Sequence, residues 1–148
     1  MSSIMYVEAA RAILAGEIDF NADTFYIRLL CTNTTADTEK TVTTVAGFTT
    51  LDEHDSAGQE ELANIAVAAD NSNLRAEFDA DDVTFTALAA ASSGRDVQGA
   101  LLCHQAGGSP ATSDIPIAFL EYASNKTPDD SDFVVRWDTE GIVRLTVP

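Results

Sequence analysis

VQGALLCHQ, from Val97 to Gln105, and IPIAFLEYA, from Ile115 to Ala123, are the two stretches that decide the fold of this chain. Each is apolar at consecutive positions, as are strands that lie in the centre of a packed sheet with both faces covered. The connection between them, AGGSPATSD, has the glycines, Pro110 and Asp114 that are typical of an exposed loop. The pair therefore predicts a long hairpin in the middle of a β-sheet.

Further strands are expected on both sides of this hairpin. TFYIRLLC (24–31) alternates like a strand, and LRAEFDADDVTFTAL (74–88) predicts two half-buried strands joined by DADD. DFVVRWD (132–138) and GIVRLTV (141–147) flank a turn in which Gly141 can take a positive φ, so a closing hairpin is expected. The segment Leu62–Ala69 fits a helix or a strand, and we favour a loop that leads into a strand.

The N-terminal part differs from the rest, because residues 1–16 predict a short amphipathic helix. Ser2 or Ser3 can cap this helix and Gly16 can end it. Apolar residues recur at helical spacing, namely Tyr6, Ala9, Ala10, Ile13 and Leu14. Residues 32–60, which are Thr-rich and then acidic, predict a long extended loop or arm, with a weak edge strand near Val42–Val45 as an alternative for part of it.

Seven to nine strands and one helix, without regular alternation of strands and helices, exclude a parallel α/β sheet. The chain, residues 1–148, therefore predicts a mainly β, single-domain fold. We expect an antiparallel β-sandwich or barrel with the short N-terminal α-helix laid against it and a long extended loop or arm.

The charge balance bears on partners, because 24 Asp and Glu stand against 8 Lys and Arg and give a net charge of -16. Such a field repels phosphate backbones, so a nucleic-acid partner is excluded. A partner with a basic surface, or a salty habitat, stays open beside the simpler interpretation that the charge resists self-association. No apolar run approaches the roughly 18 residues of a membrane-spanning helix, and the start lacks the pattern of a secretory signal.

Few residues are candidates for chemistry. Cys31 and Cys103 lie in apolar, strand-like runs and predict free, buried thiols, and a disulfide between them requires neighbouring strands. A pairing of Cys103 with His54 has no pattern in its favour, and the chain offers too few His and Cys for zinc. We therefore expect no enzyme, no catalytic, cofactor-binding or metal-ligating residue, no cofactor and no small-molecule substrate.

Three acidic clusters are candidate sites. DADD (Asp79, Asp81, Asp82) and PDDSD (Asp129, Asp130, Asp132) are carboxylate-dense, as calcium loops are, but neither has the twelve-residue pattern with its central Gly and final Glu. We expect both to be structural turns. The third cluster, Glu17, Asp19 and Asp23, has no evident His, Lys or metal-ligand partner and is expected to be the polar joint between the helix and the first strand.

The order of motifs along the chain resembles a family of small structural proteins of tailed bacteriophages. The motifs are ILAGEIDF (13–20), LRAEFDADDVTFTAL (74–88), VQGALL (97–102), IPIAFLEYAS (115–124) and FVVRWDTEGIVRL (133–145), and they span nearly the whole chain. DADDVTF and W-x-x-x-G-I are the most specific of them. The segment SAGQEELAN (56–64) departs from the family, in which Gly-Tyr and a basic residue commonly precede the strand near Leu62, so a contact through that tyrosine is not expected here.

This resemblance implies a non-enzymatic virion component. The first expectation is a capsid decoration or cement protein that binds and stabilises the lattice of the major capsid protein, as a homotrimer on the capsid surface after synthesis in the host cytoplasm. A neck or tail structural protein of the particle is the alternative. The Thr-rich segment 32–50 and the N-terminal segment 1–5 are candidates for arms that pair with the sheet edge of a neighbour.

Overall fold

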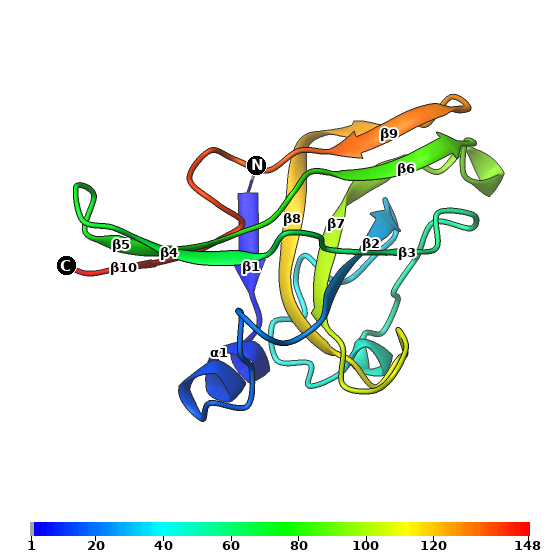
Figure 1. Cartoon of the computed structure of the whole chain (residues 1–148). Coiled ribbons are helices and arrows are strands. Elements are labelled where there is room, and N and C mark those ends of the chain that lie inside the picture. The colour runs from blue at the N-terminus through cyan, green and yellow to red at the C-terminus, as the bar shows by residue number, and fades with distance from the viewer. Residues whose placement is uncertain (1) are drawn as a thin grey trace.

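The computed structural model describes residues 2–148 and contains ten strands in antiparallel sheets with one α-helix in this part of the chain (Figure 1). The predicted mainly β, antiparallel fold with one short helix near the N-terminus is confirmed. The largest sheet has the strand order β1-β8-β7-β2-β3. Its strands are β1 (Ser2–Met5), β2 (Phe25–Cys31), β3 (Gln59–Glu61), β7 (Val97–His104) and β8 (Ile115–Lys126).

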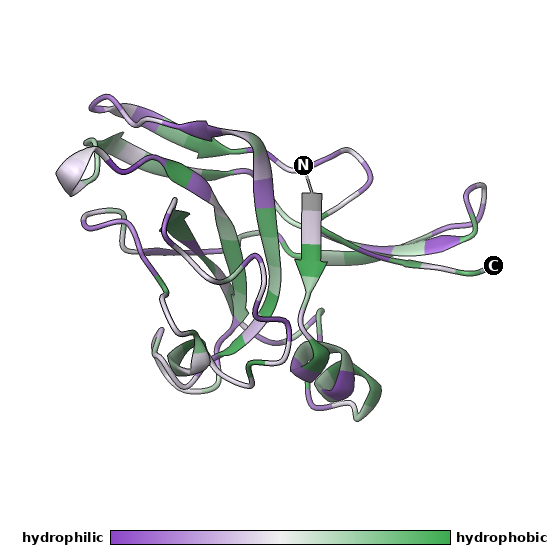
Figure 2. Ribbon diagram, turned by 180° about the vertical axis from the view of Figure 1, so that it is seen from behind, coloured by the Kyte–Doolittle hydropathy of each residue, from purple (hydrophilic) through white to green (hydrophobic). Residues whose placement is uncertain are grey.

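The predicted long hairpin lies at the centre of this sheet, because β7 pairs with β8 on one side and with β2 on the other. Every side chain of β2 is buried, so this strand has no wet face. Figure 2 shows the hydrophobic residues concentrated along these central strands of the body and the hydrophilic ones in the surrounding loops. The three longest buried runs of the sequence therefore form the core of the sheet.

Two smaller sheets complete the fold. Strands β6 (Val83–Leu88) and β9 (Ser131–Val135) form a two-stranded ribbon whose apolar side chains join the main core. Strands β4 (Ala66–Asp70), β5 (Arg75–Asp79) and β10 (Val143–Thr146) form a three-stranded sheet in the order β10-β5-β4. We call this second sheet the arm, because it extends away from the body and carries the C-terminus at its far end (Figure 1).

The predicted closing hairpin of 132–138 with 141–147 is wrong, because β9 pairs with β6 and β10 pairs with β5. Both pairs belong to one long antiparallel ribbon, which has a break between them and a smaller register shift within β6, between Phe85 and Leu88. Between the pair Phe78–Val143 and the pair Val83–Val135 the chain has four residues on one side (79–82) and seven on the other (136–142). Gly141 does take a positive φ, of 84°, but its turn absorbs the excess residues in this break instead of closing a hairpin.

The helix is shorter than predicted. It is α1 (Val7–Leu14), and Gly16 follows it with a φ of 69°, as expected of a residue that ends a helix. The residues before it, Ser2–Met5, form the edge strand β1, so a helix over residues 1–16 is wrong for this part, while Met1 lies outside the described residues. The free edge of β8 offers main-chain hydrogen bonds to this segment, and serines favour a helix interior weakly.

The buried face of the helix differs from the predicted one at two positions. Tyr6 and Ala9 are fully buried, as predicted, but so is Ala12, which was not predicted, whereas Leu14 is exposed to solvent. The Tyr6 hydroxyl donates to the carbonyl of Ala36 at 2.6 Å, which ties the start of the helix to the Thr-rich segment.

The Thr-rich segment, residues 32–50, does not project from the body as a free extension. Ala36, Val45 and Phe48 are buried in the core, and Val45 begins a short 3₁₀ turn, Val45–Gly47, where an edge strand was the alternative. Glu39 holds the segment together, since its carboxylate accepts from the Thr35 hydroxyl at 2.6 Å and from the main-chain N–H of Thr49 at 2.8 Å. The predicted loop is present over most of 32–60, but it packs against the body rather than reaching out from it.

Candidate functional site

The arm has two chemically different faces, which follow from its strand register. Residues opposite one another share a face, and the face alternates along each strand. One face carries polar and charged residues at Asp70, Arg75, Glu77 and Arg144. The other face carries Val67, Ala69, Ala76, Phe78, Val143 and Leu145, and the next residues outward, Leu74 and Val147, are joined by a main-chain hydrogen bond of 2.7 Å.

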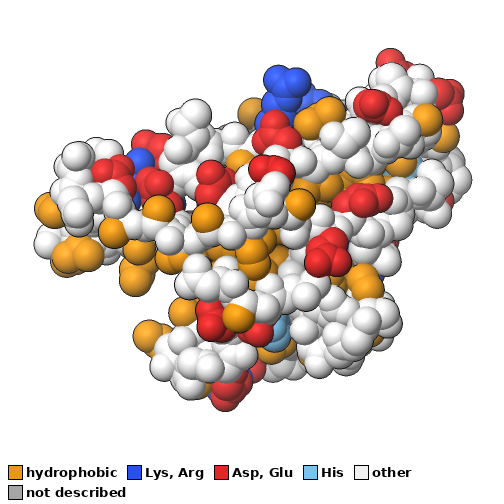
Figure 3. Space-filling view, viewed as in Figure 1, with side chains coloured by type: hydrophobic (Ala, Val, Ile, Leu, Met, Phe, Trp, Pro, Cys, Tyr) orange, Lys and Arg blue, Asp and Glu red, His pale blue; other side chains and the backbone are white. Residues whose placement is uncertain are grey.

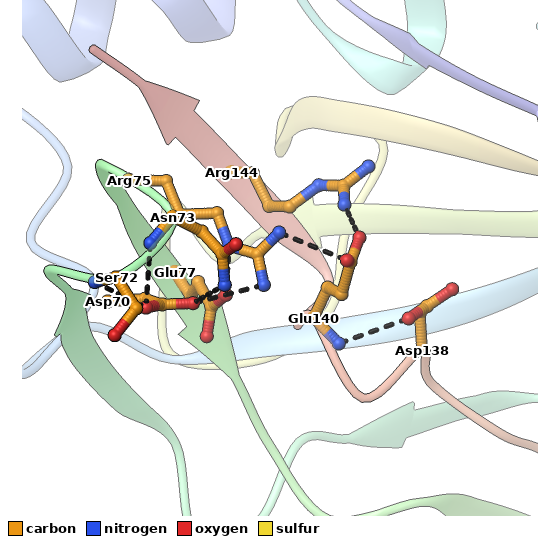
Figure 4. Close-up of polar contacts among 8 residues, drawn as sticks. All are labelled: Asp70, Ser72, Asn73, Arg75, Glu77, Asp138, Glu140 and Arg144. Carbon is orange, nitrogen blue, oxygen red and sulfur yellow. Dashed lines mark hydrogen bonds and ion pairs between the residues drawn. The ribbon is translucent and has the colours of Figure 1, made fainter.

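The polar face is a closed network around one guanidinium (Figure 4). Arg75 pairs with Glu77 at 2.5 Å, with Glu140 at 3.1 Å and with Asp70 at 3.2 Å. Glu140 is shared with Arg144, so the network joins all three strands of the arm through its acids. Hydrogen bonds from the Asn73 side chain are the main reason why the pKa of Asp70 lies below its ordinary value. The charges on this face satisfy one another and stiffen the arm.

The apolar face begins in the core and ends in solvent. At the base of the arm Phe78 is buried, with its ring 4.5 Å from that of Phe20 and 5.2 Å from that of Phe25. Further out, the exposed fraction is 43% for Val67, 59% for Leu74, 60% for Val147 and 73% for Leu145. Figure 3 shows the corresponding hydrophobic side chains along the lower side and the tip of the arm.

An uncovered apolar face of this kind is informative. Scattered exposed apolar residues are normal on a protein surface, but a contiguous group on a projecting element marks an interaction surface. A three-stranded sheet also needs a covered apolar face to be stable by itself. The single chain covers this face only at its base, so the arm is the first candidate for contact with a partner.

A groove lies between the arm and the edge of the main sheet. It has a volume of about 810 Å³, and its lining includes Ser3 and Met5 of β1, Leu120 of β8, and Arg136, Trp137 and Arg144 from the β9–β10 connection and β10. Both bordering strands are outer strands, because β1 pairs only with β8 and β10 pairs only with β5. Unpaired main-chain groups on outer strands are templates for an additional strand.

The register identifies which main-chain groups of β1 are free. The N–H of Tyr6 donates to the carbonyl of Ile117 at 3.1 Å, and in an antiparallel pair every second residue points toward the partner. Ile4 therefore faces β8, whereas the N–H and C=O of Ser3 and Met5 point outward. The groove thus has a short, open strand edge along one side.

The charge of the groove differs from that of the protein. Its charged lining residues are Arg136, Arg144 and Asp138, which sum to +1 (2 − 1), while the chain as a whole carries -16. Arg136 is 77% exposed, and the nearest carboxylate oxygen, on Asp82, is 4.0 Å away. This side chain is therefore available to an acidic partner.

The two motifs that carry the phage resemblance most specifically meet at the base of the arm. The Trp137 indole N–H donates to the carbonyl of Asp81 at 2.8 Å, and the main-chain N–H of Trp137 donates to the carboxylate of Asp82 at 3.2 Å. A side chain at position 141 would place its Cβ 2.9 Å from the carbonyl oxygen of Phe78, so only Gly141 fits there. DADD and W-x-x-x-G-I thus build the break in the long ribbon.

The carboxylates of the clusters DADD and PDDSD serve separate turns, which is the role expected of them. Asp81 accepts from the Asn64 amide at 2.6 Å, Asp132 accepts from the main-chain N–H of Ala87 at 3.0 Å, and Asp129 accepts from the Ser131 hydroxyl. Asp79 likewise accepts from the next main-chain N–H, and Asp130 adopts a positive φ. Within residues 2–148, no group of three or more His, Cys, Asp and Glu is arranged to hold a metal ion.

The acids between α1 and β2, namely Glu17, Asp19 and Asp23, have a partner that was not predicted from the sequence. Asp23 lies 3.1 Å from the Nε2 atom of His104, which comes from the end of β7, whereas no histidine partner was expected. Glu17 pairs with Arg11 at 2.5 Å, and Asp19 accepts from the main-chain N–H of Asn21 at 2.9 Å. These contacts fasten the joint.

The two thiols and His54 are all buried. Cys31 and Cys103 are both free and buried, as predicted, and burial raises their pKa values to about 11 and about 12. Their strands are neighbours, but Cys103 lies opposite Tyr26, five residues from Cys31 along β2, which is about 17 Å and too far for a disulfide. His54 pairs through its main chain with Leu29 and is buried.

A buried polar cluster at the loop between β7 and β8 was not predicted from the sequence. Asp114, expected in an exposed loop, is fully buried and accepts from the Tyr26 hydroxyl and from the main-chain N–H groups of Ala106 and Ala111. Arg28 lies beside it, donating to the Ala111 carbonyl at 3.1 Å and pairing with Glu53 at 2.8 Å. Arg28 is also buried, and the cluster closes the loop between β7 and β8.

Comparison of the chain with protein-family models, with curated proteins and with solved structures finds no match. Among the described residues, no helix has the length and apolar character needed to cross a membrane. The functional interpretation therefore depends on the arm, on the groove and on the motif resemblance.

Proposed function

We propose that this protein is a non-enzymatic structural component of a tailed-phage virion, a capsid decoration or cement protein that binds the lattice of the major capsid protein. The observation that carries the proposal is the arm, a stiff sheet whose apolar face is uncovered over its outer half. A protein that acts by covering a lattice needs such a surface and needs no pocket for a substrate.

The motif resemblance supports the same function. The most specific shared motifs, DADDVTF and W-x-x-x-G-I, build the base of the arm around Trp137 and Gly141. Selection for these motifs would then preserve the position of the arm relative to the body. The large net charge of -16 fits a shell protein too, because like-charged particles repel one another.

The location of the chain in the particle tests the proposal directly. In a cryo-EM map of the virion, we expect density of this shape at repeated positions over the capsid lattice, with the arm against the major capsid protein. Density confined to the portal vertex or the tail would refute decoration and favour the neck or tail alternative.

A binding experiment tests the role of the arm. Leu145→Gln places a polar group of similar size on the apolar face, and Leu14→Gln makes the same change on α1, where Leu14 is also exposed. We expect Leu145→Gln to weaken co-sedimentation with capsids that lack the protein by roughly tenfold or more, the effect of losing about 1.4 kcal/mol at an interface. Leu14→Gln is expected to bind like the wild type, and equal binding of both variants and the wild type would remove the arm from the capsid contact.

A further inference from the structure

We propose that the free edge of β4 in the arm of one copy pairs with the free edge of β1 in the groove of a second copy, so that the three-stranded arm extends the five-stranded sheet of its neighbour. This assembly goes beyond the proposed function, because it concerns contacts between copies of the chain whether or not a capsid is present. The occupant of the groove is thus a strand of this same protein.

The two edges match in length and in availability. Strand β1 spans four residues and β4 spans five, and all but the last residue of β4 are exposed. The hydrogen bond from Val147 to Leu74 shows that the alternate residues of β5, at 75, 77 and 79, face β4. The main-chain groups of Val67 and Ala69 therefore point outward, as do those of Ser3 and Met5 on β1.

Two copies that each carry -16 repel one another over long distances, so charge can favour this contact only locally, within the groove. The groove lining holds the weakly paired Arg136, whose nearest carboxylate oxygen is 4.0 Å away, so the groove disfavours a basic strand. The incoming strand brings no basic residue, since β4 is AVAAD, and it ends in the acid Asp70. An acidic end of this kind can meet the exposed guanidinium of Arg136 in the groove.

The contact is heterologous, since it joins two different surfaces, β1 of one copy and β4 of the next. Repetition of such a contact gives a closed ring where the rotation closes and an open fibre where it does not. A strand added to an open edge gains main-chain hydrogen bonds along its length, and edges left bare are a liability that proteins otherwise cover. Assembly through these edges covers both of them at once.

Edge prolines test the pairing without disturbing the fold of a single copy. Met5→Pro and Ala69→Pro each remove an outward N–H that makes no hydrogen bond within the chain, and proline is tolerated at such positions. Glu61→Pro is the matched control, because the hydrogen bond from Leu62 to Phe25 places the N–H of Glu61 on the outer edge of β3, away from the groove. Circular dichroism and the melting temperature measure whether each of the three variants folds like the wild type.

Sedimentation velocity over a concentration series gives the decisive readout. We expect the wild type and Glu61→Pro to associate with increasing concentration, and Met5→Pro and Ala69→Pro each to associate at least about tenfold more weakly. An equal mixture of Met5→Pro, which keeps its arm strand, and Ala69→Pro, which keeps its groove, should give a complex of two chains that grows no further.

Three results would overturn the proposal. The first is a wild type that stays monomeric up to roughly millimolar concentration. The second is association of Met5→Pro or Ala69→Pro as strong as that of the wild type. The third is a mixture of these two variants that forms no two-chain complex although each variant alone is monomeric. Charge reversal gives an independent readout, since Arg136→Glu should weaken association and Lys126→Glu, at the end of β8, should not. Because these measurements are made without capsids, failure here leaves the decoration proposal to its own tests.

Discussion

Replacing Asp114 with asparagine tests how the central hairpin is held. The carboxylate is fully buried, and it accepts three hydrogen bonds with two oxygens. One oxygen accepts from the Tyr26 hydroxyl and from the N–H of Ala111, and the other accepts from the N–H of Ala106 at 2.8 Å. All three donors belong to β2 or to the loop that joins β7 and β8.

The magnitude follows from counting donors and acceptors. Asparagine has one acceptor oxygen, so in its better orientation it serves Tyr26 and Ala111 and turns its amide N–H groups toward the N–H of Ala106. The partly buried N–H of Ala106 is then unsatisfied, and we expect Asp114→Asn to lower the free energy of unfolding by about 1 kcal/mol or more. Asp114→Ala leaves three donors without their acceptor, and we expect a larger loss of about 3–5 kcal/mol, since loop relaxation and water recover part of the sum.

Urea unfolding at pH 7, followed by far-UV circular dichroism, measures these losses. Asp138→Asn is the control, because this exposed carboxylate accepts one hydrogen bond, from the N–H of Glu140, and its loss should stay within about 0.5 kcal/mol. A double-mutant cycle with Tyr26→Phe should give a coupling of about 0.5–3 kcal/mol. An Asp114→Asn variant as stable as the wild type, or an alanine variant no worse than asparagine, would refute the role assigned to this carboxylate.

Three further predictions concern the core. Gly99→Ala would put a Cβ 2.6 Å from a main-chain oxygen of β8 and should cost about 1–3 kcal/mol or more in urea unfolding, whereas Gly107→Ala, with open space around it, should be neutral; equal stability would contradict the close approach. Burial lowers the pKa of His54 in the folded state, so the stability that comes from keeping this histidine neutral is complete above pH ~6.5 and is lost as the pH falls through the lower folded pKa. His54→Gln should therefore make the free energy of unfolding depend less steeply on pH below pH ~6.5. An unchanged slope would contradict this. Cys31 and Cys103, whose pKa values are raised, should react with a thiol reagent at pH 8 only after denaturant is added, and rapid labelling of the native protein would disprove their burial.

The strands that the sequence predicted best contain the longest buried runs. Strand β2 is buried throughout, β7 is buried over most of its length, and β8 is buried over its first half. The ten-residue loop (105–114) between β7 and β8 makes their pairing local. The pairing of β6 with β9 and of β5 with β10 could not be predicted in the same way, because it joins residues that are 43 (131 − 88) to 71 (146 − 75) positions apart in the chain. The turn at Gly141 looked like a hairpin turn, since a positive φ is needed equally for a hairpin and for a break in a ribbon.

The other differences have a tertiary cause. Residues 2–5 are compatible with a helix, but the open edge of β8 gives them a ladder of hydrogen bonds. Asp114 looked like a turn residue, because residue type does not reveal whether a loop folds back over its own carboxylate. The groove could not be predicted either, since Met5 and Arg136 stand at opposite ends of the sequence and only the fold brings them together.

The long ribbon explains why the apolar face of the arm is bare. Its strands keep the same alternation from the body to the tip, so Phe78 and Leu145 occupy equivalent positions on one face. Phe78 is buried because Phe20 and Phe25 lie against it, and Leu145 is exposed because the body ends before it. The apolar alternation that forms the core at the base of the arm thus continues along the strands to a part of the sheet against which no other element within residues 2–148 packs. A polar network on the opposite face joins the three strands at this point, so the chain maintains an apolar surface that it leaves uncovered, and this is the surface that the proposed contact with the capsid would cover.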